Sequence, residues 1–229
     1  MIYFRGVPMD KIAPVKITDI LVSPMAWTAI TRDRPIAAGV DYVRLTGRTR
    51  TVSVTFALLT NDIALRQKQL DALNKWAQSD SPDKLTFTYH EGYLTGVCTA
   101  FPEPSTRQWW ESKLRFVWTC YDPYWTSIAE RSVNCGTAFF VNGDAPPIMR
   151  LEQTLNASGN VVYSDGTNTM TFNSVPAGKL VIDLTNQTAV VGNVSVMNKY
   201  TFDSSFIVPH TGATTITGTG KVYYRERWV

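Results

Sequence analysis

The most regular alternation of hydrophobic and polar residues in this chain runs from Thr51 to Leu58. Val52, Val54 and Phe56 fall on one face, and small or hydroxyl-bearing side chains fall on the other. Successive side chains of a β-strand point to opposite faces of a sheet. The pattern therefore predicts a strand with one buried face.

The period changes to that of an α-helix over residues 61–79. Asp62 is a favourable N-cap residue, and Pro82 lies where the helix is expected to have ended. The charged face is interpreted as solvated, because the apolar residues share a single helical stripe. They are Ile63, Leu70, Leu73, Trp76 and Ala77.

Short strands and one arm account for the rest of the first half. Residues 31–47 carry several charges, Pro35 and Gly39 without a convincing period, which favours an irregular extended arm over a core element. A turn is expected at Glu91-Gly92, between two strands of a hairpin. The expected strands are 15–23, 85–89, 94–99 and 114–120.

The second half shows no helical period, and its content of Gly, Asn, Ser and Thr rises. Turn-forming residues separate many short apolar runs, which favours a two-sheet sandwich of the jelly-roll kind. The predicted strands are 138–141, 148–155, 161–163, 170–172, 179–185, 189–191, 194–197, 200–207, 214–217 and 221–228.

Between the two halves lies the sequence Asp122, Pro123, Tyr124, Trp125. Asp followed by Pro favours a turn, because Pro fixes its own φ and restricts the residue before it. Two aromatic rings beside such a turn offer enough apolar area to fix the angle between domains. We therefore interpret these four residues as an interdomain joint; the alternative is a turn whose rings fill the nearest core.

A length of 229 residues allows one large β domain or two ordinary domains. We favour two: residues 1–130, which contain the helix and the arm, and residues 131–229, which form the sandwich. The fold class predicted is mainly β with one α-helix.

The formal charge of +3 provides no strong field for nucleic acid or an anionic membrane. Apolar runs are a few residues long, far from the roughly 20 that span a bilayer. The amino terminus has no secretory leader, so synthesis in a cytoplasm is expected. Partners are expected to be proteins, with no membrane and no specific nucleic acid.

The sequence offers little for catalysis or cofactor binding. Cys98, Cys120 and Cys135 form an odd set with wide spacings, which predicts buried thiols and neither a disulfide framework nor a zinc site. The two histidines, His90 and His210, fall in different predicted domains, so a shared dyad or metal cluster is not expected. We predict no enzyme, no metal and no cofactor.

Four weaker chemical signals each have a structural alternative. Residues 218–222 look like part of a phosphate loop, but a strand is expected where a helix should follow, so a hairpin turn is favoured. Glu103 and Glu111 could act as a glycosidase pair only if they lay on either side of a sugar bond, and nothing in the sequence places them so. Trp109 and Trp110 could stack on a base or a sugar, or fill a core and an interface. The basic strip of Arg44, Arg48 and Arg50 is interpreted as a solvated edge or a subunit contact.

Taken in order, several of these segments resemble one known family. They are the arm, Arg48–Phe56, the helix through Leu70 and Leu73, Lys84–Phe87, Asp122–Trp125, Ala145–Ile148, Gly178–Asp183 and Val222–Trp228. In this order they resemble the distal tail proteins of long-tailed, non-contractile bacteriophages. None of the segments is a catalytic fingerprint, so the resemblance rests on their order over the whole chain.

This resemblance implies a structural virion protein that forms a homohexameric ring, single or stacked, at the far end of the tail tube. The amino-terminal domains would make the ring, and galectin-like carboxy-terminal sandwiches would project outward. The implied partners are the tail tube protein, the tail-tip protein and a receptor-binding protein. The implied location is the tail tip of the virion, after assembly in the host cytoplasm.

Two rival functions follow from the residues. A carbohydrate-binding module or adhesin would use exposed rings such as Trp109 and Trp110, although the sandwich lacks any large insertion that would add a separate sugar-binding module. A galectin-like fold would not by itself establish sugar binding. A cell-wall hydrolase would need an acid, base or metal set, and the sequence shows none.

Overall fold

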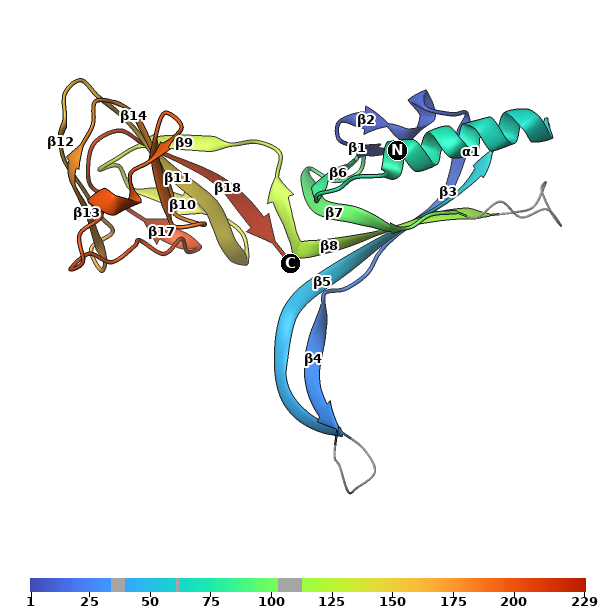
Figure 1. The fold of residues 1–229 in the computed structure, drawn as a ribbon, viewed down its shortest axis with the longest axis horizontal. Helices are drawn as coiled ribbons and strands as arrows, with labels where there is room; N and C mark the ends of the chain where they lie inside the picture. Colours follow the sequence, from blue (N-terminus) through green and yellow to red (C-terminus); the bar gives the residue numbers. More distant parts are fainter. Residues whose placement is uncertain (34–39, 61, 103–112) are drawn as a thin grey trace. The chain divides into compact units, whose positions relative to one another are not determined.

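In this computed structural model, the structure describes residues 1–33, 40–60, 62–102 and 113–229, with backbone only for residues 27–33 and 40–47 (Figure 1). The chain divides into two compact units, Met1–Trp125 and Thr126–Val229. The prediction of a mainly β fold with one α-helix is confirmed over the residues that the structure describes. Each unit has its own buried core.

The first unit is built on one sheet with strand order β2-β1-β6-β7-β8-β5-β3. Among the described strands, β4 pairs only with β5. The short strands β1 and β2 and the one-turn helix η1 at the amino terminus were not predicted. The elements are β1 (Ile2–Phe4), β2 (Val7–Pro8), η1 (Met9–Lys11), β3 (Val15–Val22), β4 (Ala26–Asp33), β5 (Val40–Leu58), α1 (Ile63–Ala77), β6 (Asp83–Phe87), β7 (Gly92–Ala100) and β8 (Leu114–Ser127).

Helix α1 begins where the sequence predicts. The Asp62 carboxylate accepts hydrogen bonds from the backbone N–H groups of Ala64 and Leu65, at 2.8 and 3.2 Å. The apolar stripe is buried from Leu70 onward, but Ile63 is 65% exposed, so its place in the core was predicted wrongly. Figure 1 shows the reason, because the first turn of α1 extends beyond the strands that the helix covers.

The core of the first unit is a cluster of aromatic rings between α1 and the sheet. Trp118 is fully buried on β8, and its ring lies 6.1 Å from Trp76 of α1, 6.1 Å from Phe4 of β1 and 5.4 Å from Phe116. Pairs of rings at such separations stabilise a core beyond the area they bury. The helix is thus held to the sheet through Trp76.

The predicted irregular arm is a regular two-stranded ribbon, which corrects the prediction for residues 31–33 and 40–47. Strands β4 and β5 pair in antiparallel fashion from Ala26 opposite Thr49 to Asp33 opposite Val40, and residues 34–39 lie outside the described part. Figure 1 shows the ribbon leaving the sheet of the first unit. Along this stretch β5 pairs, among the described strands, only with β4, so the ribbon lies outside the ladders of the main sheet.

The predicted Asp-Pro turn is also wrong, since Asp122 and Pro123 lie inside β8. The pairing of β8 with β5 ends at Cys120, opposite Arg50. Because that pairing has ended, Pro123, which has no backbone N–H, interrupts no hydrogen bond to β5. Its fixed φ also suits an extended chain. The strand therefore runs through the sequence that was expected to bend.

The second unit has a sheet of order β16-β15-β14-β11-β18-β9 and two separate ribbons, β10–β17 and β12–β13. Its elements are β9 (Arg131–Asn134), β10 (Phe139–Val141), β11 (Ala145–Leu155), β12 (Gly159–Ser164), β13 (Thr169–Val175), β14 (Gly178–Asp183), β15 (Thr188–Val191), β16 (Val194–Ser195), η2 (Met197–Lys199), β17 (Gly212–Thr214) and β18 (Lys221–Trp228).

One core joins the sheet and the ribbons of the second unit. Met149 and Leu151 of β11 are buried together with Tyr163 of β12 and Phe172 of β13. Side chains from two layers thus fill one interior, as in a β-sandwich. The predicted turn at residues 218–220 lies directly before β18, which begins at Lys221.

One predicted strand of the second unit is wrong. Residues 200–207 form no strand, and Tyr200 packs instead against Phe172 and Phe206, with ring centroids 5.2 and 4.9 Å apart. The apolar residues that suggested a strand are buried by ring packing in an irregular segment. The strand expected at 214–217 is displaced to β17.

Candidate functional site

The four residues predicted as an interdomain joint lie consecutively on β8. The boundary between the two compact units follows Trp125 directly. Trp125 is only 8% exposed and packs against Phe87, with ring centroids 5.6 Å apart. The phenol oxygen of Tyr124 accepts a hydrogen bond from Arg48, at 3.3 Å. These contacts place Tyr124 and Trp125 in the first unit.

His90 is held as a packing residue. Its ring is stacked on Trp125, with centroids 3.7 Å apart, and its Nδ1 accepts a hydrogen bond from the backbone N–H of Gly92 at 2.9 Å. Burial lowers the pKa of the imidazole from its ordinary value, which favours the neutral ring. His210 belongs to the second unit.

The cysteines lie in environments that suppress reactivity. Burial raises the pKa of the Cys98 and Cys120 thiols to about 12, and it also raises the pKa of the half-buried Cys135. A thiol reacts as its thiolate, so these groups stay protonated near neutral pH. The predicted burial holds for Cys98 and Cys120.

Over the described part of the chain, no three His, Cys, Asp or Glu side chains lie close enough together to hold a metal ion. No helix there is both long and apolar enough to cross a membrane. Trp109, Trp110, Glu103 and Glu111 lie outside the described residues.

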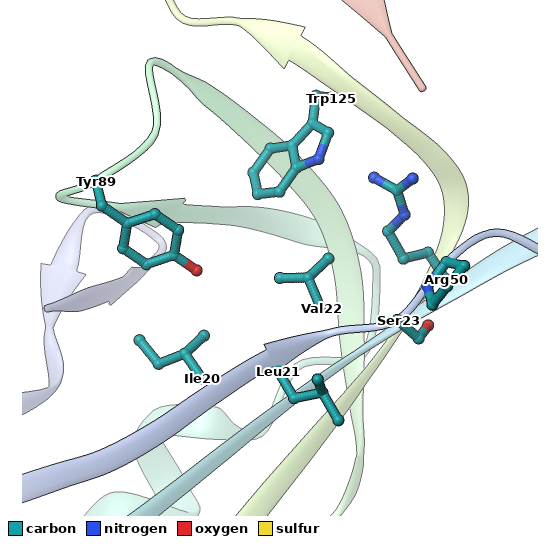
Figure 2. A pocket seen from close by; sticks show the side chains of 8 residues that line it. Ile20, Leu21, Val22, Ser23, Arg50, Tyr89 and Trp125 are labelled. Carbon is teal, nitrogen blue, oxygen red and sulfur yellow. The ribbon is translucent and has the colours of Figure 1, made fainter.

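A groove of about 510 Å³ lies in the first unit where the ribbon leaves the sheet (Figure 2). Its lining comes from β3, from the Ser23-Pro24 connection, from β5, from Tyr89 and from Trp125. Figure 2 shows Ile20 and Val22 pointing toward the space beside Tyr89 and Trp125. The walls are therefore largely apolar and aromatic.

Arg50 is the charged residue of this groove. It was predicted to lie at a solvated edge or a subunit contact. It is 6% exposed, which contradicts the solvated alternative, because it lies on the same face of β5 as Val52, Val54 and Phe56. The period of two could have revealed this position in the sequence. Arg48 is half-buried, and the side chain of Arg44 lies outside the described part.

Ser23 fixes the chain at the edge of the groove. Its backbone N–H donates to the carbonyl of Thr51 at 2.9 Å, and its Oγ accepts from the N–H of Thr51 at 2.8 Å. Strand β3 is thereby pinned to β5 just before the ribbon begins. The groove and the root of the ribbon share this anchor.

The second unit carries a network of alternating charges. Arg150 donates from Nη2 to Glu130 at 2.8 Å and from Nε to Glu152 at 2.9 Å. Glu152 also pairs with Lys179 at 2.7 Å, and Arg225 approaches Glu130 at 3.5 Å. The hydrogen bond from Arg150 lowers the pKa of Glu130. Burial acts to raise the pKa of Glu152, but Lys179 and Arg150 outweigh it and lower that pKa.

This network predicts a pH-dependent stability of the second unit. A carboxyl whose pKa is lowered on folding stabilises the folded state above its unfolded pKa, and this stabilisation is lost as the pH falls below it. We expect the second unit to lose on the order of 1 kcal/mol as the pH falls below 4.5, the ordinary value for Glu, and through the lowered pKa values of Glu130 and Glu152. Glu130→Gln should reduce this loss in urea titrations across pH. Asp203→Asn, at an exposed carboxylate, should leave it unchanged; an equal effect of both variants would contradict the assignment.

Neither a protein-family model nor a curated protein sequence matches this chain. Among solved structures, the Dit (gp 19.1) protein of phage SPP1 is similar over 100% of this chain and 98% of that chain, with a TM-score of 0.75 at 13% identity. SPP1 Dit is described as a paradigm of the hub adsorption apparatus in phages that infect Gram-positive bacteria. A chain of the phage P2 baseplate in its activated conformation with Ca matches 95% of this chain and 91% of its own, with a TM-score of 0.52 at 7% identity.

The resemblance to distal tail proteins that the sequence predicts is confirmed in the fold. At 13% identity the shared property is the arrangement of elements over the whole chain. Both units of this chain lie within the matched region.

Proposed function

We propose that this chain is a structural, non-enzymatic protein of a phage tail tip, where it acts as a hub between the tail tube and the tail-tip or baseplate proteins. The observation that carries this proposal is the similarity of the whole chain to SPP1 Dit, which covers 98% of that protein. A match over both units favours a role that uses the complete two-unit architecture. Fold alone does not fix function, so the assembly itself has to be tested.

The β4–β5 ribbon supports an assembly role on physical grounds. A two-stranded ribbon is marginally stable by itself in water, and among the described strands β4 pairs only with β5. A ribbon of this kind gains stability when another subunit covers it. We propose that it contacts a neighbouring copy in a closed ring of six, which requires a head-to-tail interface.

The remaining parts of the proposal concern the joint, the partners and the location. Asp122, Pro123, Tyr124 and Trp125 are proposed to serve as the joint between a ring-forming unit and a β-sandwich unit. Receptor-binding proteins would attach to the assembled hub. The chain would be synthesised in the host cytoplasm and would reside at the tail tip of the virion.

Native mass spectrometry and negative-stain electron microscopy test the ring. Six copies of the 25.6 kDa chain should give a particle of about 154 kDa, or twice that mass for stacked rings, either alone or after addition of a tail partner. A chain that stays monomeric under both conditions would contradict the proposal.

A further inference from the structure

Arg50 carries a buried charge with no counter-ion among the described residues. Its Nε is buried without a hydrogen-bond partner, and the ionisable groups that act on it are Cys120 and His90. Burial raises the pKa of Cys120 to about 12 and lowers the pKa of His90. Neither group therefore supplies a negative charge near neutral pH.

An unpaired buried charge is costly to the folded chain. The buried Glu226 of the second unit shows the usual arrangement, because it accepts two hydrogen bonds from Asn142 and pairs with Arg131 at 3.3 Å. Arg50 has no such compensation from the residues that the structure describes. A ligand that brings an anion into the groove would neutralise the charge of Arg50.

The donors around Arg50 suit a carboxylate. In Figure 2 the guanidinium of Arg50 lies on that side of the Trp125 ring which carries the indole nitrogen. A guanidinium presents a planar fork of donors that matches a carboxylate, and an indole N–H can only donate. Beside these donors, Tyr89 exposes 58% of its surface and offers an apolar ring. The groove thus matches an acidic group with an apolar neighbour.

The shape of the site favours an extended polypeptide. The groove follows residues 20–24, at the end of β3. Among the described strands, β3 pairs only with β5, so its other edge is open to a further strand. Proteins often bind an extended segment along such an edge, with side chains entering adjacent pockets.

The charge distribution favours a partner other than this chain. Residues 1–125 contain 15 Lys and Arg against 12 Asp and Glu, a net charge of +3, whereas residues 126–229 contain 7 of each. The first unit therefore carries the whole net positive charge of the chain. This charge is too small for a strong long-range field, but beside Arg50 it favours an acidic segment at contact distance.

We propose that the groove beside Arg50 binds an extended segment of a different tail protein. An Asp or Glu side chain of that segment would pair with Arg50, and an apolar neighbour would pack on Tyr89 and Trp125. This inference rests on the proposed hub function, because only that function identifies the bound partner as a tail protein.

Two synthetic peptides, acetyl-Val-Leu-Asp-Leu-Val-amide and its Asn counterpart, test the groove on the full chain. Binding is followed by NMR at the Trp125 indole N–H and the Arg50 Nε–H. We expect the Asp peptide to bind at least tenfold more tightly than the Asn peptide. Arg50→Met should abolish this preference, and Lys68→Met, which removes an exposed positive charge of the same unit, should leave it unchanged. Equal binding of the two peptides, or binding of neither, would overturn the proposal.

Thermal unfolding distinguishes a binding arginine from a structural one. Arg50→Met should unfold at the same temperature as the wild type or higher, because the variant removes a buried unpaired charge and keeps an apolar side chain of similar length. A melting temperature lowered by several degrees would show that Arg50 stabilises the isolated fold, and would overturn the proposal.

Native mass spectrometry of Arg50→Met separates this inference from the proposed ring. The variant should keep the self-assembly of the wild type. If Arg50→Met dissolves a wild-type oligomer, the occupant is a second copy, and the assignment to a different protein is overturned. If the wild type forms no ring under any condition, the ring proposal fails, while the peptide experiment still decides the groove.

Discussion

Replacing residues 28–47 with Asn-Gly should convert the proposed ring to monomers while the first unit stays folded. The replacement joins Trp27 to Arg48, which are opposite each other in the β4–β5 register. Asn-Gly suits a two-residue hairpin turn. The pairing of β5 with β3 and with β8 begins only beyond residue 49, so the sheet is retained.

The expected change in the free energy of unfolding of the isolated chain is small, within about 1 kcal/mol, because a two-stranded ribbon contributes little by itself. The expected change in assembly is large, from a six-copy particle to a single chain in native mass spectrometry. A matched variant replaces only residues 34–39 with Asn-Gly, joining the opposed residues Asp33 and Val40. It keeps the whole ladder and should still assemble. Wild-type assembly of the longer deletion would show that the ribbon is dispensable.

Trp118→Ala should produce the largest loss of stability in the first unit. Trp118 is fully buried and lies within about 6 Å of three other rings, from Phe4, Trp76 and Phe116. Truncating a buried Trp to Ala costs about 3–5 kcal/mol, through lost burial and the cavity left behind. Loss of this ring would also release Trp76, and with it the packing of α1 on the sheet.

Trp118→Phe is the matched control. Phenylalanine keeps a ring at the centre of the cluster and removes the indole Nε1, which is buried without a hydrogen-bond partner among the described residues. Removing an unsatisfied polar group offsets part of the lost volume, so we expect a cost of about 1 kcal/mol. Urea denaturation followed by circular dichroism measures both variants. Equal losses from Ala and Phe would show that the ring cluster does not hold the first unit together.

Local periodicity was enough to predict most of the core. The alternation through Val52, Val54 and Phe56 and the helical stripe through Leu70 and Leu73 both end in buried positions. In each case one face of the element packs on a core, so the sequence had to repeat with the period of the backbone. The prediction fails at the ribbon, where β4 and β5 pair, among the described strands, only with each other over residues 26–49 and the sequence carries no clear period.

The groove could not be predicted, because its lining comes from positions far apart in the sequence. Ile20, Arg50, Tyr89 and Trp125 meet only through the order of strands in the sheet. The burial of Arg50 was accessible from its parity with Val52, but its lack of a partner depends on how Cys120 and His90 lie around it. Whether Arg50 has a counter-ion therefore depends on its neighbours in three dimensions and not on the local sequence.

The length of β5 has a mechanical consequence. This single strand of 19 residues forms one side of the ribbon and then continues between β3 and β8. A pull on the ribbon along the strand would be transmitted through covalent bonds into the sheet. There it would act on two ladders whose hydrogen bonds lie perpendicular to the strand, so many bonds would share the load in shear instead of opening one after another. The ribbon is therefore anchored as a tether that can bear tension.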